Sequence, residues 1–226
     1  MTKEHIESKL TTIWDKFSNK FESGDLNKVL DRKFVYTLPE KSDILITGIN
    51  PSFREGSVEA PISYKLSDAK HSYFTTLRKI APIHNGHTSY LDLFHFKNTE
   101  QSILSKFYLE KDLGLGFLAE QLNLTQHIIE WIAPKVILVM NKGSWGFWGK
   151  ESNCTWMGYE MEMLNESFKF GQLCQITGLR LNNDRVAPEI EQTSLKGTKV
   201  YFSRHLNRMS NEQLELIKEE IASIVI

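Results

Sequence analysis

Short apolar runs that alternate with helical patterns constrain the fold of this chain more than any other feature. Four strand-sized runs stand out, at 43–48 (DILITG), 90–96 (YLDLFHF), 135–140 (KVILVM) and 199–202 (KVYF). Amphipathic helical patterns occur around them, at 3–22, 67–80, 117–131 and 210–224. Strands this apolar are typical of a parallel sheet that helices cover on both faces. We therefore expect an α/β fold, a three-layer sandwich around a central, mostly parallel sheet of four strands.

The two ends of the chain carry helix signals of their own. In 3–22 the apolar residues recur at intervals of three and four, and Gly24 then stands where a helix stop is expected. We expect 1–24 to form an N-terminal helix that packs on a single domain covering 1–226. Near the other end, Ser210 and Gln213 form the pattern of a capping box. Residues 174–177 are a further candidate for a short strand.

Charge and cysteine content narrow the classes of function. The 226 residues carry 27 Lys and Arg against 28 Asp and Glu, a formal net charge of −1. This balance argues against a histone-like coat of nucleic acid but leaves room for a local basic groove. Two cysteines, Cys154 and Cys174, are too few for a four-cysteine iron–sulfur site, and we interpret them as ordinary thiols. We expect no metal and no cofactor.

Targeting and membrane signals are also weak. The first residues include acidic ones, and the apolar runs are only strand-sized. Neither pattern fits a signal peptide or a membrane span. We therefore expect a cytoplasmic protein. As a separate expectation, we take the protein to be a monomer.

The turns that follow the strands are the candidates for function, because ligands of parallel sheets bind beyond the carboxyl ends of the strands. In the first turn, Pro51 forces Asn50 out of the helical region, and Gly48 allows close backbone approach. Asn50 would then be presented rigidly, with its amide available to a water or a ligand. The alternative is a plain Asn-Pro turn.

The next two turns leave more than one interpretation open. Asp92 lies inside an apolar strand, where a carboxylate is costly unless it is paired, so it binds either a structural partner or a ligand. Gly143 and Ser144 precede a group of aromatic residues that either stacks on bases or packs in the core. That group comprises Trp145, Phe147, Trp148 and Trp156.

The fourth turn is basic. Between 196 and 208 the chain has four cations and no acidic residue; the cations are Lys196, Lys199, Arg204 and Arg208. The stretch ends before a helix N-terminus, an arrangement suited to phosphate. His205 could donate a hydrogen bond to a developing anion, or it could be a structural polar residue.

Taken together, these turns resemble the motifs of the uracil-DNA glycosylase superfamily. The first family motif, Gly-x-Asn-Pro-Gly or Gly-Gln-Asp-Pro-Tyr, is matched by Gly48, Ile49, Asn50, Pro51 and Ser52. The family's strand followed by Gly-Ser is matched by Gly143 and Ser144. Its last motif, a His-Pro-Ser-Pro-Leu-Ser-type loop, is matched by Ser203, Arg204, His205, Leu206, Asn207 and Arg208, with Phe202 as an alternative to His205 for the family's histidine. The matched motifs extend from 43 to about 210.

The resemblance implies a role for each motif. An Asn at position 50 is similar to the mismatch-specific and single-strand-selective monofunctional branches, in which it orients a water for attack on the sugar. Tyr64 would stack on the flipped base, and Leu206 would fill the gap left in the base stack. The last loop would stabilise the leaving base and bind phosphates. Asp92 replaces the Asn that reads uracil, and since an ionised Asp only accepts hydrogen bonds, a different base is expected.

These implications give three hypotheses. The first is a monofunctional DNA glycosylase that hydrolyses the N-glycosidic bond of a flipped uracil-like or otherwise damaged or modified base. The second is a non-catalytic DNA- or nucleotide-binding module on the same fold, suggested by the altered last motif. The third, an unrelated α/β hydrolase, lacks the Gly-x-Ser-x-Gly signature. Asn50 and His205 are the candidate catalytic residues of the first hypothesis.

Overall fold

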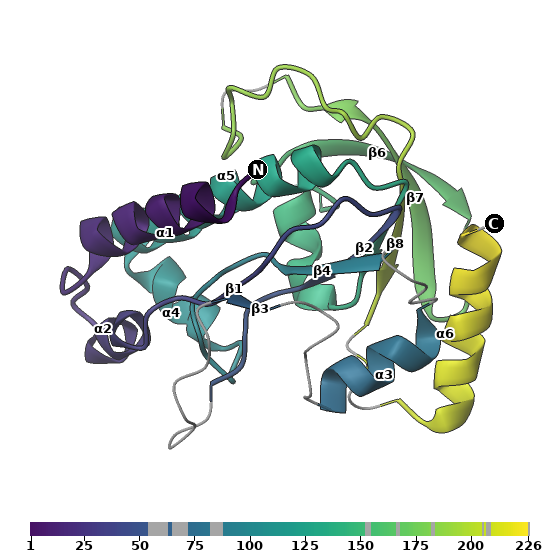
Figure 1. Ribbon diagram of the computed structural model, residues 1–226, viewed down its shortest axis with the longest axis horizontal. Coiled ribbons are helices and arrows are strands. Elements are labelled where there is room, and N and C mark those ends of the chain that lie inside the picture. Colours follow the sequence, from purple (N-terminus) through teal and green to yellow (C-terminus); the bar gives the residue numbers. More distant parts are fainter. Residues whose placement is uncertain are drawn as a thin grey trace.

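The computed structural model describes residues 1–53, 63–64, 72–81, 88–151, 155–165, 168–181, 184–204, 206 and 209–225. Figure 1 shows a twisted sheet with helices on both sides. The N-terminal part consists of α1 (Lys3–Phe17), α2 (Gly24–Asp31), β1 (Tyr36–Thr37), β2 (Ile44–Gly48), β3 (Ser63–Tyr64), α3 (Ser72–Ile80) and β4 (Thr88–Asp92). The rest consists of α4 (Ile103–Leu109), α5 (Lys111–Ile132), β5 (Val136–Val139), the 3₁₀ helix η2 (Lys142–Trp148), β6 (Tyr159–Asn165), β7 (Gly171–Leu179), β8 (Lys199–Ser203) and α6 (Asn211–Ile224).

The central sheet has six strands in the order β4-β2-β5-β8-β7-β6. The first four are the apolar runs found in the sequence, and they are parallel to one another. β7 and β6 extend the sheet in antiparallel fashion. The predicted α/β fold with a mostly parallel sheet is therefore confirmed, whereas the prediction of four strands is wrong. The short strand expected at 174–177 is the middle of a nine-residue strand.

Strand residues alternate between two apolar clusters, one on each face of the sheet. Leu45 and Ile137 face the larger cluster, to which α1, α2, α4 and α5 contribute. Ile46 and Leu138 face the smaller one, together with α3 and α6. In Figure 1, α1 lies along α5 on one side, and α3 and α6 lie together on the other. Both faces are buried, which explains why the parallel strands read as continuous apolar runs.

The N-terminal helix is shorter than the sequence pattern predicted. α1 ends at Phe17, and Gly24, expected as its stop, instead begins a second helix, α2. Phe21 extends the helical spacing beyond α1 because its ring packs in the core, 5.6 Å from Phe107 and 5.9 Å from Phe117 between ring centroids. At the other end of the chain, the predicted capping box of α6 is confirmed, with both hydrogen bonds present.

Candidate active site

The four parallel strands bring the predicted turns to one edge of the sheet. Asn50, Asp92, Gly143 and Arg204 lie at or just beyond the carboxyl ends of β2, β4, β5 and β8, which are neighbours. The chain after β2 leads to α3, which packs on one face of the sheet. The chain after β5 leads to η2, whose residues pack on the opposite face. Connections that diverge between adjacent parallel strands mark the usual ligand site of an open α/β sheet. That position lies between the ends of β2 and β5.

Asn50 is held by backbone carbonyl groups. Its Nδ2 donates hydrogen bonds to Pro51 O at 3.0 Å and to Asn98 O at 2.6 Å. Only the amide nitrogen can donate to a carbonyl, so these bonds determine how the side-chain amide is turned. Within the described part of the chain, Oδ1 is left as the acceptor of this half-buried side chain. The arrangement suits a group that orients a water without deprotonating it.

The segment that contains Asn50 is tied to the segment after β4. The backbone N–H of Asn98 donates to Pro51 O at 2.9 Å. The Phe53 N–H donates to Thr99 Oγ1 at 3.2 Å, and the Thr99 hydroxyl in turn donates to Phe53 O. We call 50–53 and 97–99, joined by these bonds, the paired loops. They are a feature that the sequence did not indicate, since each contact joins residues more than 40 positions apart.

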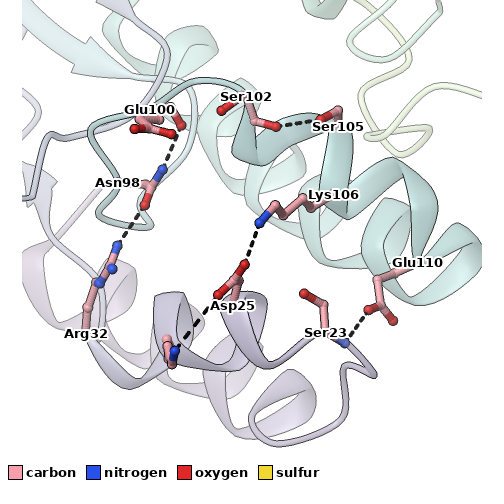
Figure 2. A network of polar contacts seen from close by, with 10 residues as sticks. Ser23, Asp25, Arg32, Asn98, Glu100, Ser102, Ser105, Lys106 and Glu110 are labelled. Carbon is pink, nitrogen blue, oxygen red and sulfur yellow. Dashed lines mark hydrogen bonds and ion pairs between the residues drawn. The ribbon is translucent and has the colours of Figure 1, made fainter.

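A third element completes the paired loops. Arg32, at the end of α2, donates from one guanidinium nitrogen to Asn98 Oδ1 at 2.7 Å and to Lys97 O at 3.2 Å. Figure 2 shows Arg32 reaching Asn98, whose Nδ2 in turn donates to Glu100 O. The guanidinium carbon also lies 4.2 Å from the centroid of the Phe53 ring, within cation–π range. Arg32 therefore contacts both of the paired loops.

Asp92 is buried rather than presented at the edge. It pairs with Gly48 in the sheet, is 4% exposed and accepts a hydrogen bond from Tyr90 OH at 2.7 Å. Burial, with a smaller contribution from the Asp92 charge, raises the pKa of Tyr73 well above its usual value. A Cβ atom on Gly48 would lie 2.1 Å from Tyr90 Oη and 2.3 Å from Asp92 Oδ1. Gly48 is thus required by the close approach of this Tyr–Asp pair.

The turn after β5 is a short 3₁₀ helix whose start is capped from within. Asn141 Oδ1 accepts from the Gly143 N–H at 2.8 Å, and the Ser144 hydroxyl donates to Asn141 O at 2.7 Å. Gly143 is exposed and lies close to Ile49, but Ser144 is fully buried. Gly143 is therefore accessible at this edge with its N–H already bonded to Asn141, whereas the Ser144 side chain is not accessible in this conformation.

The aromatic group after β5 belongs mainly to the core. Phe147 and Trp148 are buried, and Phe147 packs edge-on against Phe94, with centroids 4.9 Å apart. Trp145 and Trp156 are half-buried against the same cluster. Of the two interpretations of these residues, the structure supports core packing.

The turn after β8 is described in part. Ser203 is buried, and its hydroxyl donates to Phe170 O at 3.4 Å, whereas Arg204 is exposed. Leu206 is 1% exposed and packs in the cluster of α6, so in this conformation it is a core residue and not an exposed wedge. The predicted residues His205, Asn207 and Arg208 lie outside the described residues, as does the side chain of Tyr64, whose backbone pairs with Thr37.

The basic stretch of the sequence does not form one surface. Lys196 and Lys199 lie before and at the start of β8, whereas Arg204 follows its end. Lys199 donates to Ile224 O, at the end of α6, at 3.2 Å. At about 3.3 Å per residue, the five residues of β8 separate the two groups by roughly 16 Å. Among the described cations of this stretch, only Arg204 is at the edge that carries Asn50.

A cavity of about 340 Å³ adjoins the paired loops. Phe53, Asn98 and Thr99 line it from the loops, and Arg32 lines it from α2. Across the cavity, Lys106 bonds Asp25 at 2.5 Å (Figure 2). None of the described residues predicted from the motifs is among those that line this cavity, so it is a feature of the structure and not of the sequence pattern.

Neither a metal site nor a membrane-spanning helix occurs in the ranges that the structure describes. In them, no three His, Cys, Asp or Glu side chains are grouped to hold a metal ion. No helix among those residues has the length and apolar character needed to cross a membrane. The chain matches no protein-family model, and no curated protein matches it. The geometry of the sheet edge and the motif resemblance are therefore the two indications of function.

Proposed function

We propose that this protein is a monofunctional DNA N-glycosylase that acts on a flipped uracil-like or otherwise damaged or modified base. The observation that carries the proposal is the fixed amide of Asn50 at the carboxyl end of β2. Oδ1 would accept a hydrogen bond from a water and aim its oxygen at C1′ of the sugar. The C1′–N bond breaks, the base leaves with the bonding electrons, the water oxygen bonds to C1′, and the proton that this oxygen loses ends on the departed base.

An amide suits a reaction in which the bond to the base breaks early. Asn cannot take a proton from the water at neutral pH, so it cannot make the water a stronger nucleophile. The base must therefore leave as an anion, and another group must stabilise the negative charge. We assign that role to His205, in the loop after β8, as a hydrogen-bond donor to the developing anion. Arg204, exposed beside it in sequence, would contact a phosphate. Because water and not a lysine is the nucleophile in this proposal, the product is an abasic site.

A second candidate is a DNA- or nucleotide-binding module that does not cut. The burial of Leu206 favours it, because opening a base pair in duplex DNA usually requires a side chain to occupy the gap. The same burial is compatible with a glycosylase that takes bases from single strands, which need no wedge.

The two candidates are separated by an oligonucleotide panel. Single-stranded and duplex substrates carrying uracil, hypoxanthine, xanthine or substituted uracils are incubated with the protein and then treated with alkali. A glycosylase yields alkali-labile strands for at least one base, more readily in single strands. Salt-sensitive binding to every oligonucleotide with no cleavage of any would contradict the catalytic proposal and support the second candidate.

Asn50→Ala tests the mechanism on whichever base is excised. Loss of the water-orienting oxygen should lower the single-turnover rate by about 10²–10³-fold, with little change in the dissociation constant for DNA. Lys218→Ala, an exposed change on α6, is the surface control and should match wild type. An Asn50→Ala protein as active as wild type would refute the assigned role.

A further inference from the structure

Arg32, the residue that follows α2, contacts both of the paired loops with its side chain. It bonds Asn98 Oδ1 and Lys97 O on one loop and stacks on Phe53 of the other. Its position follows directly from α2, which ends at Asp31 and packs through Leu26, Val29 and Leu30 in the larger apolar cluster. The guanidinium is therefore held by an anchored helix.

The contact between Arg32 and Asn98 acts on Asn50 through one residue. Asn98 uses its side-chain oxygen to accept from Arg32 and its backbone oxygen to accept from Asn50 Nδ2. Moving Asn98 therefore moves the acceptor that orients the Asn50 amide. Two hydrogen bonds from one nitrogen, together with ring stacking, need the planar guanidinium group, and an ammonium group cannot reproduce them.

We infer that Arg32 is a positioning residue for Asn50, acting through Asn98, in the proposed base-excision reaction on which this inference rests. Arg32 does not touch the reacting atoms. It holds 97–98 against 50–53, so that the oxygen of Asn50 points where the attacking water must lie. A shift of about 1 Å in such a group costs up to 10²-fold in rate, so a residue remote from the chemistry can control it.

The cavity beside Arg32 makes the inference testable by chemical rescue. Arg32 lines the cavity, so Arg32→Ala would enlarge a space that is already present. Free guanidinium at millimolar concentration can then occupy the position of the lost group. Lys106→Ala is the matched control, since Lys106 lines the same cavity but forms its ion pair with Asp25 on α2 and not with the paired loops. Its ion pair is exposed and contributes little to stability.

The first readout does not depend on activity. The side-chain amide signals of Asn50 in a ¹⁵N–¹H spectrum, assigned by their loss in Asn50→Asp, report the hydrogen bonds of Nδ2. Arg32→Ala and the milder Arg32→Lys should shift these signals and speed their exchange with water, and guanidinium should reverse the change in Arg32→Ala only. Lys106→Ala should leave the signals at the wild-type position. Signals that respond equally to Arg32→Ala and Lys106→Ala would overturn the inference.

The second readout uses the excision rate. Arg32→Ala should lower the single-turnover rate about 10–100-fold with less than a threefold change in DNA affinity, and guanidinium should restore part of it. Asn98→Ala keeps the backbone oxygen but loses Oδ1, so the double variant Arg32→Ala/Asn98→Ala should be no slower than the slower single variant. Multiplied effects in the double variant would refute action through Asn98.

The two proposals can fail separately. If wild type excises no base, the glycosylase proposal fails, and the Asn50 amide signals still decide whether Arg32 positions that side chain. If wild type is active but Arg32→Lys and Lys106→Ala have the same amide signals and the same rate, the role of Arg32 fails alone.

Discussion

The segments that follow two neighbouring strands, β2 and β4, differ in how they are held. The segment after β4 is anchored by its own side chains, since Leu93, Phe94, His95 and Phe96 are all fully buried. Among the described residues 49–53 of the segment after β2, only Ile49 is buried, and hydrogen bonds hold the rest, most of them to the segment after β4. We call residues 93–99, after β4, the support and residues 49–53, after β2, the presented segment. Asn50 lies on the presented segment, where a side chain can meet a ligand.

This difference shows why a residue near a site can matter without facing it. The support supplies backbone carbonyl and hydroxyl groups at defined places, and the presented segment adopts its conformation by bonding to them. The orientation of the Asn50 side chain therefore depends on the support as well as on the Asn-Pro turn.

Gly48→Ala should disturb both segments at their common origin. The new Cβ would lie 2.1 Å from Tyr90 Oη and 2.3 Å from Asp92 Oδ1, and both side chains are buried. Strands β2 and β4 must then separate or the Tyr–Asp pair must move. We expect the free energy of unfolding to fall by about 3 kcal/mol, the upper end for overpacking, as measured by urea denaturation.

Tyr90→Phe is the partner variant for that test. It removes the hydroxyl that a Cβ on Gly48 would meet, at the cost of the hydrogen bond to Asp92. The double variant Gly48→Ala/Tyr90→Phe should therefore be more stable than the sum of the two single effects predicts. Strict additivity would show that the Tyr–Asp pair is not what excludes a side chain at position 48.

His95 should make the support sensitive to acid. Burial lowers the pKa of His95 to about 4 from 6.5, so the folded protein keeps it neutral while the unfolded chain takes up a proton below about pH 6.5. The stability that depends on a neutral His95 is fully present above pH 6.5 and is lost as the pH falls towards 4. We expect a loss of about 2–3 kcal/mol by pH 4, measured as the pH dependence of urea unfolding.

His95→Gln removes this titration and should flatten the curve between pH 6.5 and 4. His5→Gln, at an exposed position of α1, is the control and should leave the slope as in wild type. If the support holds Asn50, acid should also change the Asn50 amide signals before global unfolding, in wild type but not in His95→Gln. An unchanged slope in His95→Gln would contradict the assignment of the acid sensitivity to His95.

The sequence predicted the parallel strands well for a physical reason. Runs such as Val136–Val139 are buried on both faces, so their pattern depends little on neighbours. The antiparallel β6 was missed although its sequence, YEMEMLN, alternates polar and apolar residues, a signal that a search for apolar runs does not detect. α2 was missed because eight residues carry too few repeats to show a helical period.

The sequence predicts the position of a site residue only where the course of the backbone alone determines that position. Asn-Pro after a strand predicts where Asn50 stands, and the parallel order explains why Asp92 and Gly143 lie at the same edge. The burial of Asp92 against Tyr90 depends on the close packing of Gly48. Arg32 and Asn98 are 66 positions apart, and no local pattern indicates their contact.

Thr99→Val should give the smallest effect of these variants. It tests whether the hydrogen bonds between Thr99 and Phe53 affect the position of Asn50. Valine keeps the shape of threonine but can neither accept from the Phe53 N–H nor donate to Phe53 O. Because the site is exposed, we expect a loss of about 1 kcal/mol in stability and only a two- to threefold slower excision. Thr12→Val, which removes one exposed hydroxyl bond on α1, is the matched control and should leave the rate unchanged. A rate loss as large as that of Arg32→Ala would mean that Phe53, and not Asn98, transmits the position of the support to Asn50.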